Sequence, residues 1–169
     1  EIADRKKDVY DEDLIAIISN GFWDLPESFV LKLIQSVSSS EGRSTATVEL
    51  EKDGKLFHDS ATGDGPCDAA FRAIDRITGT PGSISDLSVH TVGEGTSGIA
   101  EVSIRASFQG REFTGKRTSQ NVVESAARAY LQAANRAIYE FQQLAEAASA
   151  APKPVHTNAM VDRMFPAGY

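Results

Sequence analysis

Residues 44–78, STATVELEKDGKLFHDSATGDGPCDAAFRAIDRIT, predict two strands, a tight turn and a helix in that order. The first part alternates apolar and polar side chains, which is the period of a half-buried strand. Asp53-Gly54 then gives a strong hairpin signal, so we expect residues 55–62 to run back as the neighbouring strand. A glycine-rich turn follows, and Pro66 stands at the favourable first position of the helix that fills the rest of the stretch.

The chain around this stretch repeats the same plan. Residues 29–37, FVLKLIQSV, predict a strand that precedes the hairpin and completes a three-stranded sheet. The second half predicts the same order again, with strands at 85–92, 99–110 and 111–118 and a long helix at about 121–146.

A shift of 56 residues aligns the two halves without a gap and gives eight identities over 43 positions. Chance would give about two or three at ordinary residue frequencies. The identical pairs are Leu31/Leu87, Gly42/Gly98, Gly54/Gly110, Phe57/Phe113, Thr62/Thr118, Ala70/Ala126, Arg72/Arg128 and Ala73/Ala129. The alignment indicates an internal duplication.

The duplication predicts an α+β fold of two βββα units, each a three-stranded antiparallel sheet with its own helix, related by a pseudo-twofold axis. The expected divisions are a linker segment at 1–27 with a short helix at 11–20, a duplicated domain at 28–146 and a C-terminal tail at 147–169, with repeat one at about 29–80 and repeat two at about 85–146.

Composition excludes several classes of protein. The net charge of −7 argues against nucleic acid and anionic membrane as partners, and no apolar run approaches the length of a membrane span. The single cysteine excludes an internal disulfide and fits a reducing, cytoplasmic compartment. Because the chain begins at Glu1 rather than Met, we expect it to be a piece of a longer protein.

The glycine turn GDGPCDAAF allows two interpretations. Backbone amides at a helix N-terminus favour an anion, but Asp64 and Asp68 would repel a phosphate, and neither phosphate-loop pattern is present. A small zwitterion fits better, because its carboxylate could meet the amides and its ammonium Asp68. The alternative is a plain turn from strand to helix, in which Asp68 only complements the helix dipole.

Other chemistry has little support in the sequence. His58, His90 and His156 are far apart and show no metal-ligand spacing, so we expect no metal site. Cys67 has no histidine near it and is better read as a small core residue than as a nucleophile. Alanines recur along the long helix, where they permit either close packing on its own sheet or a subunit interface.

Three stretches together carry a resemblance to a known family: GDGPCDAAFRAIDRITG (63–79), DLSVHTVGEGTSGIAEVSI (86–104) and GREFTGKRTSQNVVESAARAYLQAANR (110–136). They resemble the C-terminal regulatory domain of the α-isopropylmalate synthase and (R)-citramalate synthase family, and residues 1–17 resemble the linker before it. The resemblance implies a pair of βββα units that senses an end-product amino acid. It also implies a homodimer, and an upstream TIM barrel that holds the catalytic residues and a divalent metal, so that this fragment has no catalytic residues and no cofactor.

The resemblance also implies an effector site at the dimer interface. Carried over position by position, its residues are Cys67, Asp68, Ile84, Leu87, Thr91, Gly98, Ala100 and Asn121. Leu87 stands where a tyrosine is frequent in the family. The implied effector is L-leucine. The alternatives are L-isoleucine, as in a citramalate synthase, and a free-standing dimeric amino-acid-binding module with no barrel.

Overall fold

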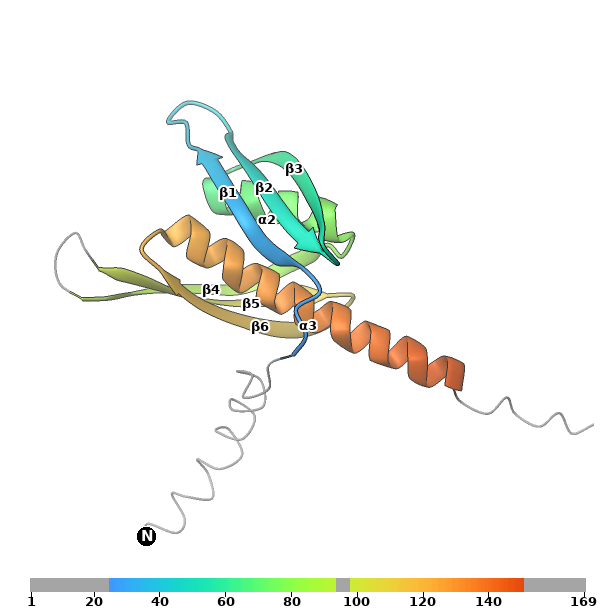
Figure 1. The fold of residues 1–169 in the computed structure, drawn as a ribbon. Coiled ribbons are helices and arrows are strands. Elements are labelled where there is room, and N and C mark those ends of the chain that lie inside the picture. Colours follow the sequence, from blue (N-terminus) through green and yellow to red (C-terminus); the bar gives the residue numbers. More distant parts are fainter. Residues whose placement is uncertain (1–24, 94–97, 151–169) are drawn as a thin grey trace, which may run out of the picture.

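The computed structural model describes residues 25–93 and 98–150, which form two βββα units (Figure 1). The first unit contains β1 (Val30–Val37), β2 (Ser44–Lys52), β3 (Lys55–Gly63) and α2 (Pro66–Thr78). The second contains β4 (Gly82–Val92), β5 (Ile99–Phe108), β6 (Arg111–Ser119) and α3 (Val122–Ala150). Each sheet is antiparallel with its strands in chain order. The predicted α+β fold is confirmed; the helix predicted at 11–20 lies outside the described residues.

Both hairpins are made by the same tight turn. Asp53 and Gly54 have φ values of 52° and 77°, and Gln109 and Gly110 have values of 51° and 80°. A two-residue turn with positive φ at both positions matches the twist of the strands that it joins, and glycine adopts this conformation at no steric cost. The hairpin predicted from Asp53-Gly54 is therefore confirmed, and it recurs in the second unit.

The two units differ in the offset of their first strands. Val48 and Ile104 occupy equivalent places in the central strands, 56 residues apart, but they pair with Ile34 and Leu87, which are only 53 residues apart. The predicted match of Leu31 with Leu87 is therefore wrong for these strands.

The irregularities in the two first strands obey the shorter offset. The register shifts after Leu31 in β1 and after Ile84 in β4, and these two residues are also 53 positions apart. The connection from the first to the second strand is thus three residues longer in the second unit. Strand β4 also begins at Gly82, three residues before the predicted strand at 85–92.

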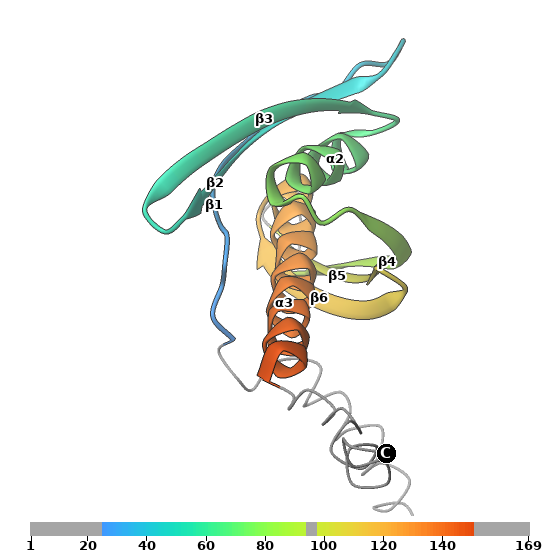
Figure 2. The ribbon, with the colours of Figure 1, turned by 90° about the vertical axis from the view of Figure 1, so that its right-hand side faces the viewer.

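The two helices lie between the two sheets, as Figure 2 shows. Helix α2 packs on β2 and β3, α3 packs on β5 and β6, and the helices contact each other. Phe71 of α2 stacks on Tyr130 of α3 with ring centroids 4.6 Å apart. The buried residues form one core that both units share.

The small residues of α3 are used within the chain. Ala129, Ala133 and Ala134 are fully buried, and a Cβ added to Gly115 of β6 would overlap the carbonyl oxygen of Ala129. The helix therefore lies closer to its sheet than larger residues would allow. The reading of this stripe as a subunit interface is wrong, because its own sheet and α2 cover it.

The end of α3 extends beyond both sheets. Residues 142–150 are exposed, and the helix continues to Ala150, four residues past its predicted end at about 146. The rest of the expected tail lies outside the described residues. No helix in the described parts is long and apolar enough to span a membrane.

Candidate functional site

Strand β4 carries an apolar strip that its own helix leaves open. Ile84, Leu87, Val89 and Thr91 pair with buried residues of β5 and thus point to the helix side of the sheet. Even so, Ile84, Leu87 and Val89 are 38%, 39% and 43% exposed, because α3 covers β5 and β6 rather than β4. We call these four residues the β4 strip.

Three further candidate residues lie at one end of the same sheet. Ala100 of β5 pairs with Thr91, and its carbonyl accepts a 3.1 Å hydrogen bond from the Ser125 hydroxyl at the start of α3. Gly98 lies two positions before Ala100. Asn121 caps α3, since its side-chain oxygen accepts hydrogen bonds from the amides of the first turn. The structure thus brings Thr91, Gly98, Ala100 and Asn121 into one region.

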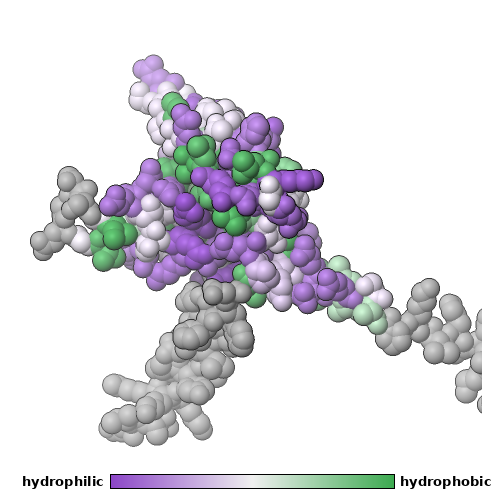
Figure 3. Space-filling model, viewed as in Figure 1, coloured by the Kyte–Doolittle hydropathy of each residue, from purple (hydrophilic) through white to green (hydrophobic). Residues whose placement is uncertain are grey.

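Exposed apolar side chains continue at this end of the sheet. Val92 and Ile99 are 58% and 44% exposed, and Figure 3 shows a hydrophobic patch at the end of the sheet where β4 leads to β5. A second hydrophobic area lies over β1, where Val30 and Leu33 are exposed. Contiguous exposed apolar surface of this kind marks interaction sites.

The remaining two candidates, Cys67 and Asp68, lie in the first turn of α2. This helix begins after Gly65, which offers no side-chain cap, and Pro66 takes the first position. Helix α3, by contrast, is capped by Asn121. Among the described residues, no side chain caps the first turn of α2, so this turn is the better place for an external carboxylate.

Asp68 is engaged within its own chain. Its Oδ2 atom accepts a 3.0 Å hydrogen bond from the amide of Asp64 and forms a 3.1 Å ion pair with Arg72. The second unit repeats this pair as Glu124 with Arg128, at 2.9 Å. The repetition identifies a structural role for Asp68, and its partial exposure leaves the carboxylate accessible to a ligand as well.

Cys67 does not have the surroundings of a reactive thiol. Burial raises its pKa above the ordinary value, which keeps the thiol protonated at neutral pH. His58 and His90 lie exposed on strands, and His156 falls outside the described residues. No group of three or more metal-binding side chains occurs in the described part of the chain.

Within one chain the candidate residues form two separate groups. The start of α2 carries Cys67 and Asp68, while β4, β5 and the start of α3 carry the others, and contact between α2 and β4 is at most marginal. Sequence reasoning missed Val89 of the β4 strip. Its signal was the alternation with Leu87 and Thr91, which places all three on one face.

Comparisons with known proteins agree with this architecture. Residues 8–138 match the LeuA allosteric (dimerisation) domain family. The chain is 37% identical over 140 residues to 2-isopropylmalate synthase of Clostridium kluyveri, covering 83% of this chain and 27% of the relative. It is 38% identical over 144 residues to the enzyme of that name from Microcystis aeruginosa, with coverages of 85% and 27%. For that of Nostoc sp. (strain PCC 7120), the values are 38% over 137 residues, 80% and 26%.

The chain therefore spans about a quarter of the length of these relatives. The family match covers both βββα units up to the middle of α3, and with them the whole shared core. The chain thus belongs to the LeuA allosteric (dimerisation) domain family.

Proposed function

We propose that this chain is the regulatory domain of a 2-isopropylmalate synthase and that it binds L-leucine for feedback inhibition. Relatives of that name match it at 37–38% identity over about a quarter of their length, as expected for one domain of a larger enzyme. In this proposal the condensation of acetyl-CoA with 2-oxoisovalerate, and the divalent metal, belong to a barrel domain outside this chain.

The observation that carries the proposal is the pairing of an exposed apolar strip with an uncapped helix. An amino-acid effector needs donors for its carboxylate, an anion for its ammonium and an apolar surface for its side chain. The first turn of α2 offers the donors, Asp68 offers the anion, and the β4 strip offers the apolar surface. Burying a four-carbon side chain on this strip would contribute about 3 kcal/mol.

We further propose that a second copy of the chain completes the site. The two groups of candidate residues stay apart within one protomer, and the apolar β4 strip has no cover in the described structure. A homodimer that brings the β4 strip of one copy toward the start of α2 of the other would join them. The location expected from the lone cysteine, the cytoplasm, stays a prediction.

Calorimetric titration of this chain with L-leucine and with L-isoleucine tests the effector assignment. We expect leucine to bind with a stoichiometry of one per chain and at least tenfold more tightly than isoleucine. Tighter binding of isoleucine would instead favour the regulatory domain of a citramalate synthase. If neither amino acid binds, the effector assignment is wrong. The sequence encoded before Glu1 separates both enzymes from a free-standing module.

A further inference from the structure

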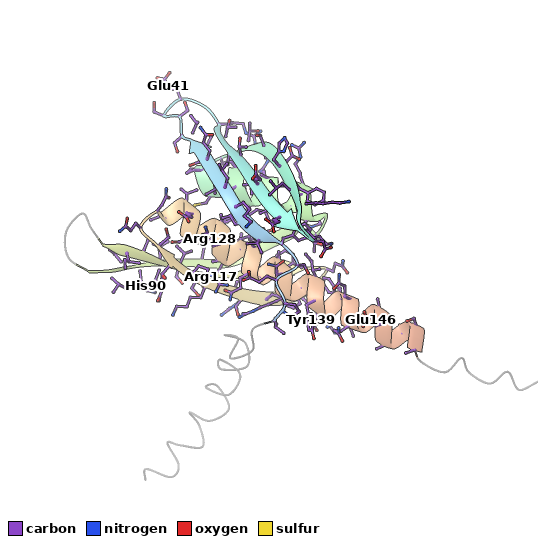
Figure 4. All side chains as sticks on the ribbon, viewed as in Figure 1. Glu41, His90, Arg117, Arg128, Tyr139 and Glu146 are labelled. Atoms are coloured by element: carbon purple, nitrogen blue, oxygen red, sulfur yellow. The ribbon has the colours of Figure 1, made fainter. Side chains whose placement is uncertain are left out.

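A groove between β6 and the second half of α3 has no role in the proposed effector site. Its volume is about 430 Å³. We call it the β6–α3 groove, and its principal lining residues are Leu25, Phe113, Thr114, Arg136, Tyr139 and Gln143. Figure 4 shows Tyr139 close to the place where the described chain begins. None of the candidate effector residues lines this groove.

The groove has an aromatic wall that the chain supports from behind. Phe113 lies edge-on to Phe108 of the core and to Phe141 of α3, at centroid distances of 6.2 and 6.0 Å. Phe113 and Tyr139 remain only half-buried. A rigid, partly open aromatic surface of this kind suits an apolar segment better than a polar ligand.

A cationic hollow adjoins the groove through Arg136, which lines both. Lys116 and Arg117 form its other charged walls, in a hollow of about 270 Å³. Burial and the neighbouring charge of Arg117 lower the pKa of Arg136, so an acidic group placed here would be favoured. In a chain with a net charge of −7, such a concentration of positive charge is a local exception.

The chain itself already sends one acidic residue to this region. Glu27 forms a 3.1 Å ion pair with Arg117, and Leu25, two residues earlier, lines the groove. The segment that precedes Leu25 therefore starts from the mouth of the groove. A tether this short keeps the segment at a high effective concentration, which favours intramolecular docking.

The preceding segment has the matching composition. Residues 11–23 read DEDLIAIISNGFW, with three acidic residues first and aliphatic and aromatic residues after them. A helix of the twelve residues from Asp13 to Asp24 would span about 18 Å, enough to run along the groove toward the hollow. The order along the chain puts the apolar part nearest the groove and the acidic part farther on.

We propose that residues 11–23 of this same chain dock in the β6–α3 groove, with their apolar side chains on Phe113 and Tyr139 and their acidic residues beside Arg117 and Arg136. The segment that leads into the domain is thereby held on α3 and β6. The proposal does not depend on which effector the domain binds.

Trp23 is the only tryptophan of the chain, so its fluorescence reports directly on docking. In the full 169-residue chain we expect blue-shifted emission and weak quenching by acrylamide. Tyr139→Asp should shift the emission to the red and raise the quenching constant at least threefold. Gln142→Asp places the same charge on the neighbouring, exposed position and should change neither value. Equal quenching in all three chains would overturn the proposal.

A substitution within the segment guards against misfolding of Tyr139→Asp, because it leaves the described core untouched. Ile18→Asp should expose Trp23 to the same extent, whereas Ser19→Asp should not. Combining Ile18→Asp with Tyr139→Asp should add nothing further, because both remove one interaction. The quenching constant should also be independent of protein concentration. Protection of Trp23 that disappears on dilution would instead assign the groove to a second copy and overturn intramolecular docking.

Discussion

The hydroxyl of Tyr130 on α3 donates a 2.6 Å hydrogen bond to the Oδ1 atom of Asp75 on α2, and this bond joins the two βββα units. The amide of Gly82, at the start of β4, donates to the same oxygen at 3.4 Å. A side chain at Gly82 would overlap the Tyr130 hydroxyl and the ring of Phe108. The end of the first unit, the start of the second and the middle of its helix thus meet at one carboxylate.

Tyr130→Phe should lower the free energy of unfolding by about 2 kcal/mol at neutral pH. The substitution keeps the stacked ring but removes the donor from a partly buried carboxylate, and hydrogen bonds to charged groups are worth about 1.5–3 kcal/mol. Urea denaturation measures the difference. Tyr139→Phe is the control, since the structure gives the Tyr139 hydroxyl no hydrogen bond, and it should change stability by less than about 0.5 kcal/mol. Equal effects of the two substitutions would contradict a special role for the Asp75 bond.

The stability of the domain should depend on pH through Asp75. Burial raises the pKa of this carboxyl from 3.8 to about 6, although the hydrogen bonds from Tyr130 and Gly82 lower it in part. The folded state therefore holds the proton more tightly than the unfolded chain. This stabilisation is fully present below about pH 4 and is lost as the pH rises through about 6.

The loss should be on the order of 2 kcal/mol, since each pKa unit corresponds to about 1.4 kcal/mol and the side chain is only partly buried. Asp75→Asn keeps the acceptor oxygen but does not titrate. Denaturation of both chains between about pH 4 and pH 7 should give a profile that falls less steeply for Asp75→Asn by that amount. Parallel profiles would show that Asp75 titrates normally.

Gly115→Ala should destabilise the domain by about 3 kcal/mol. The added methyl group would overlap the carbonyl oxygen of Ala129 and push α3 away from β6. Thermal denaturation measures the effect. Gly65→Ala is the matched control, because nothing lies within 4 Å of a Cβ there and φ is −148°. It should cost less than about 1 kcal/mol. A tolerated Gly115→Ala would mean that the helix and sheet can separate freely.

Asp68→Asn should weaken L-leucine binding about tenfold, because it removes the charge proposed to meet the ammonium group, and 1.4 kcal/mol corresponds to a factor of ten. Its effect on stability should be less than about 1 kcal/mol, since the ion pair with Arg72 is exposed. Glu124→Gln removes the equivalent ion pair with Arg128 in the second unit. It should cost the same stability and leave leucine binding unchanged. If both variants bind leucine normally, Asp68 serves only its helix.

Leu87→Asp should convert the chain to a monomer, because it places a charge in the β4 strip that the second copy is proposed to cover. His90→Asp puts the same charge on the opposite, exposed face of the strand and should leave the dimer intact. Sedimentation velocity distinguishes the two states. A dimer that survives Leu87→Asp would place the interface on another surface.

The order of the elements could be predicted from the sequence because local signals set it. Alternation at Ala46, Val48 and Leu50 fixes which side of β2 is buried, and Asp53-Gly54 fixes the hairpin. The candidate residues came from a family resemblance, since nothing local to Ile84 or Thr91 indicates a binding site. The structure places Thr91, Gly98, Ala100 and Asn121 together but leaves Cys67 and Asp68 in a separate group.

The rest depended on contacts between residues distant in the sequence. Leu31 aligns with Leu87 by identity, yet strand pairing makes it equivalent to Ile84, because register is set by partner strands and not by residue type. The alanines of α3 suited an interface or a core equally well, and only the close approach to Gly115 decides between them. The sequence by itself determined two βββα units and their turns. The tertiary structure decided which faces those units cover and which they leave open, because a helix one strand short of the edge of its sheet leaves the β4 strip exposed.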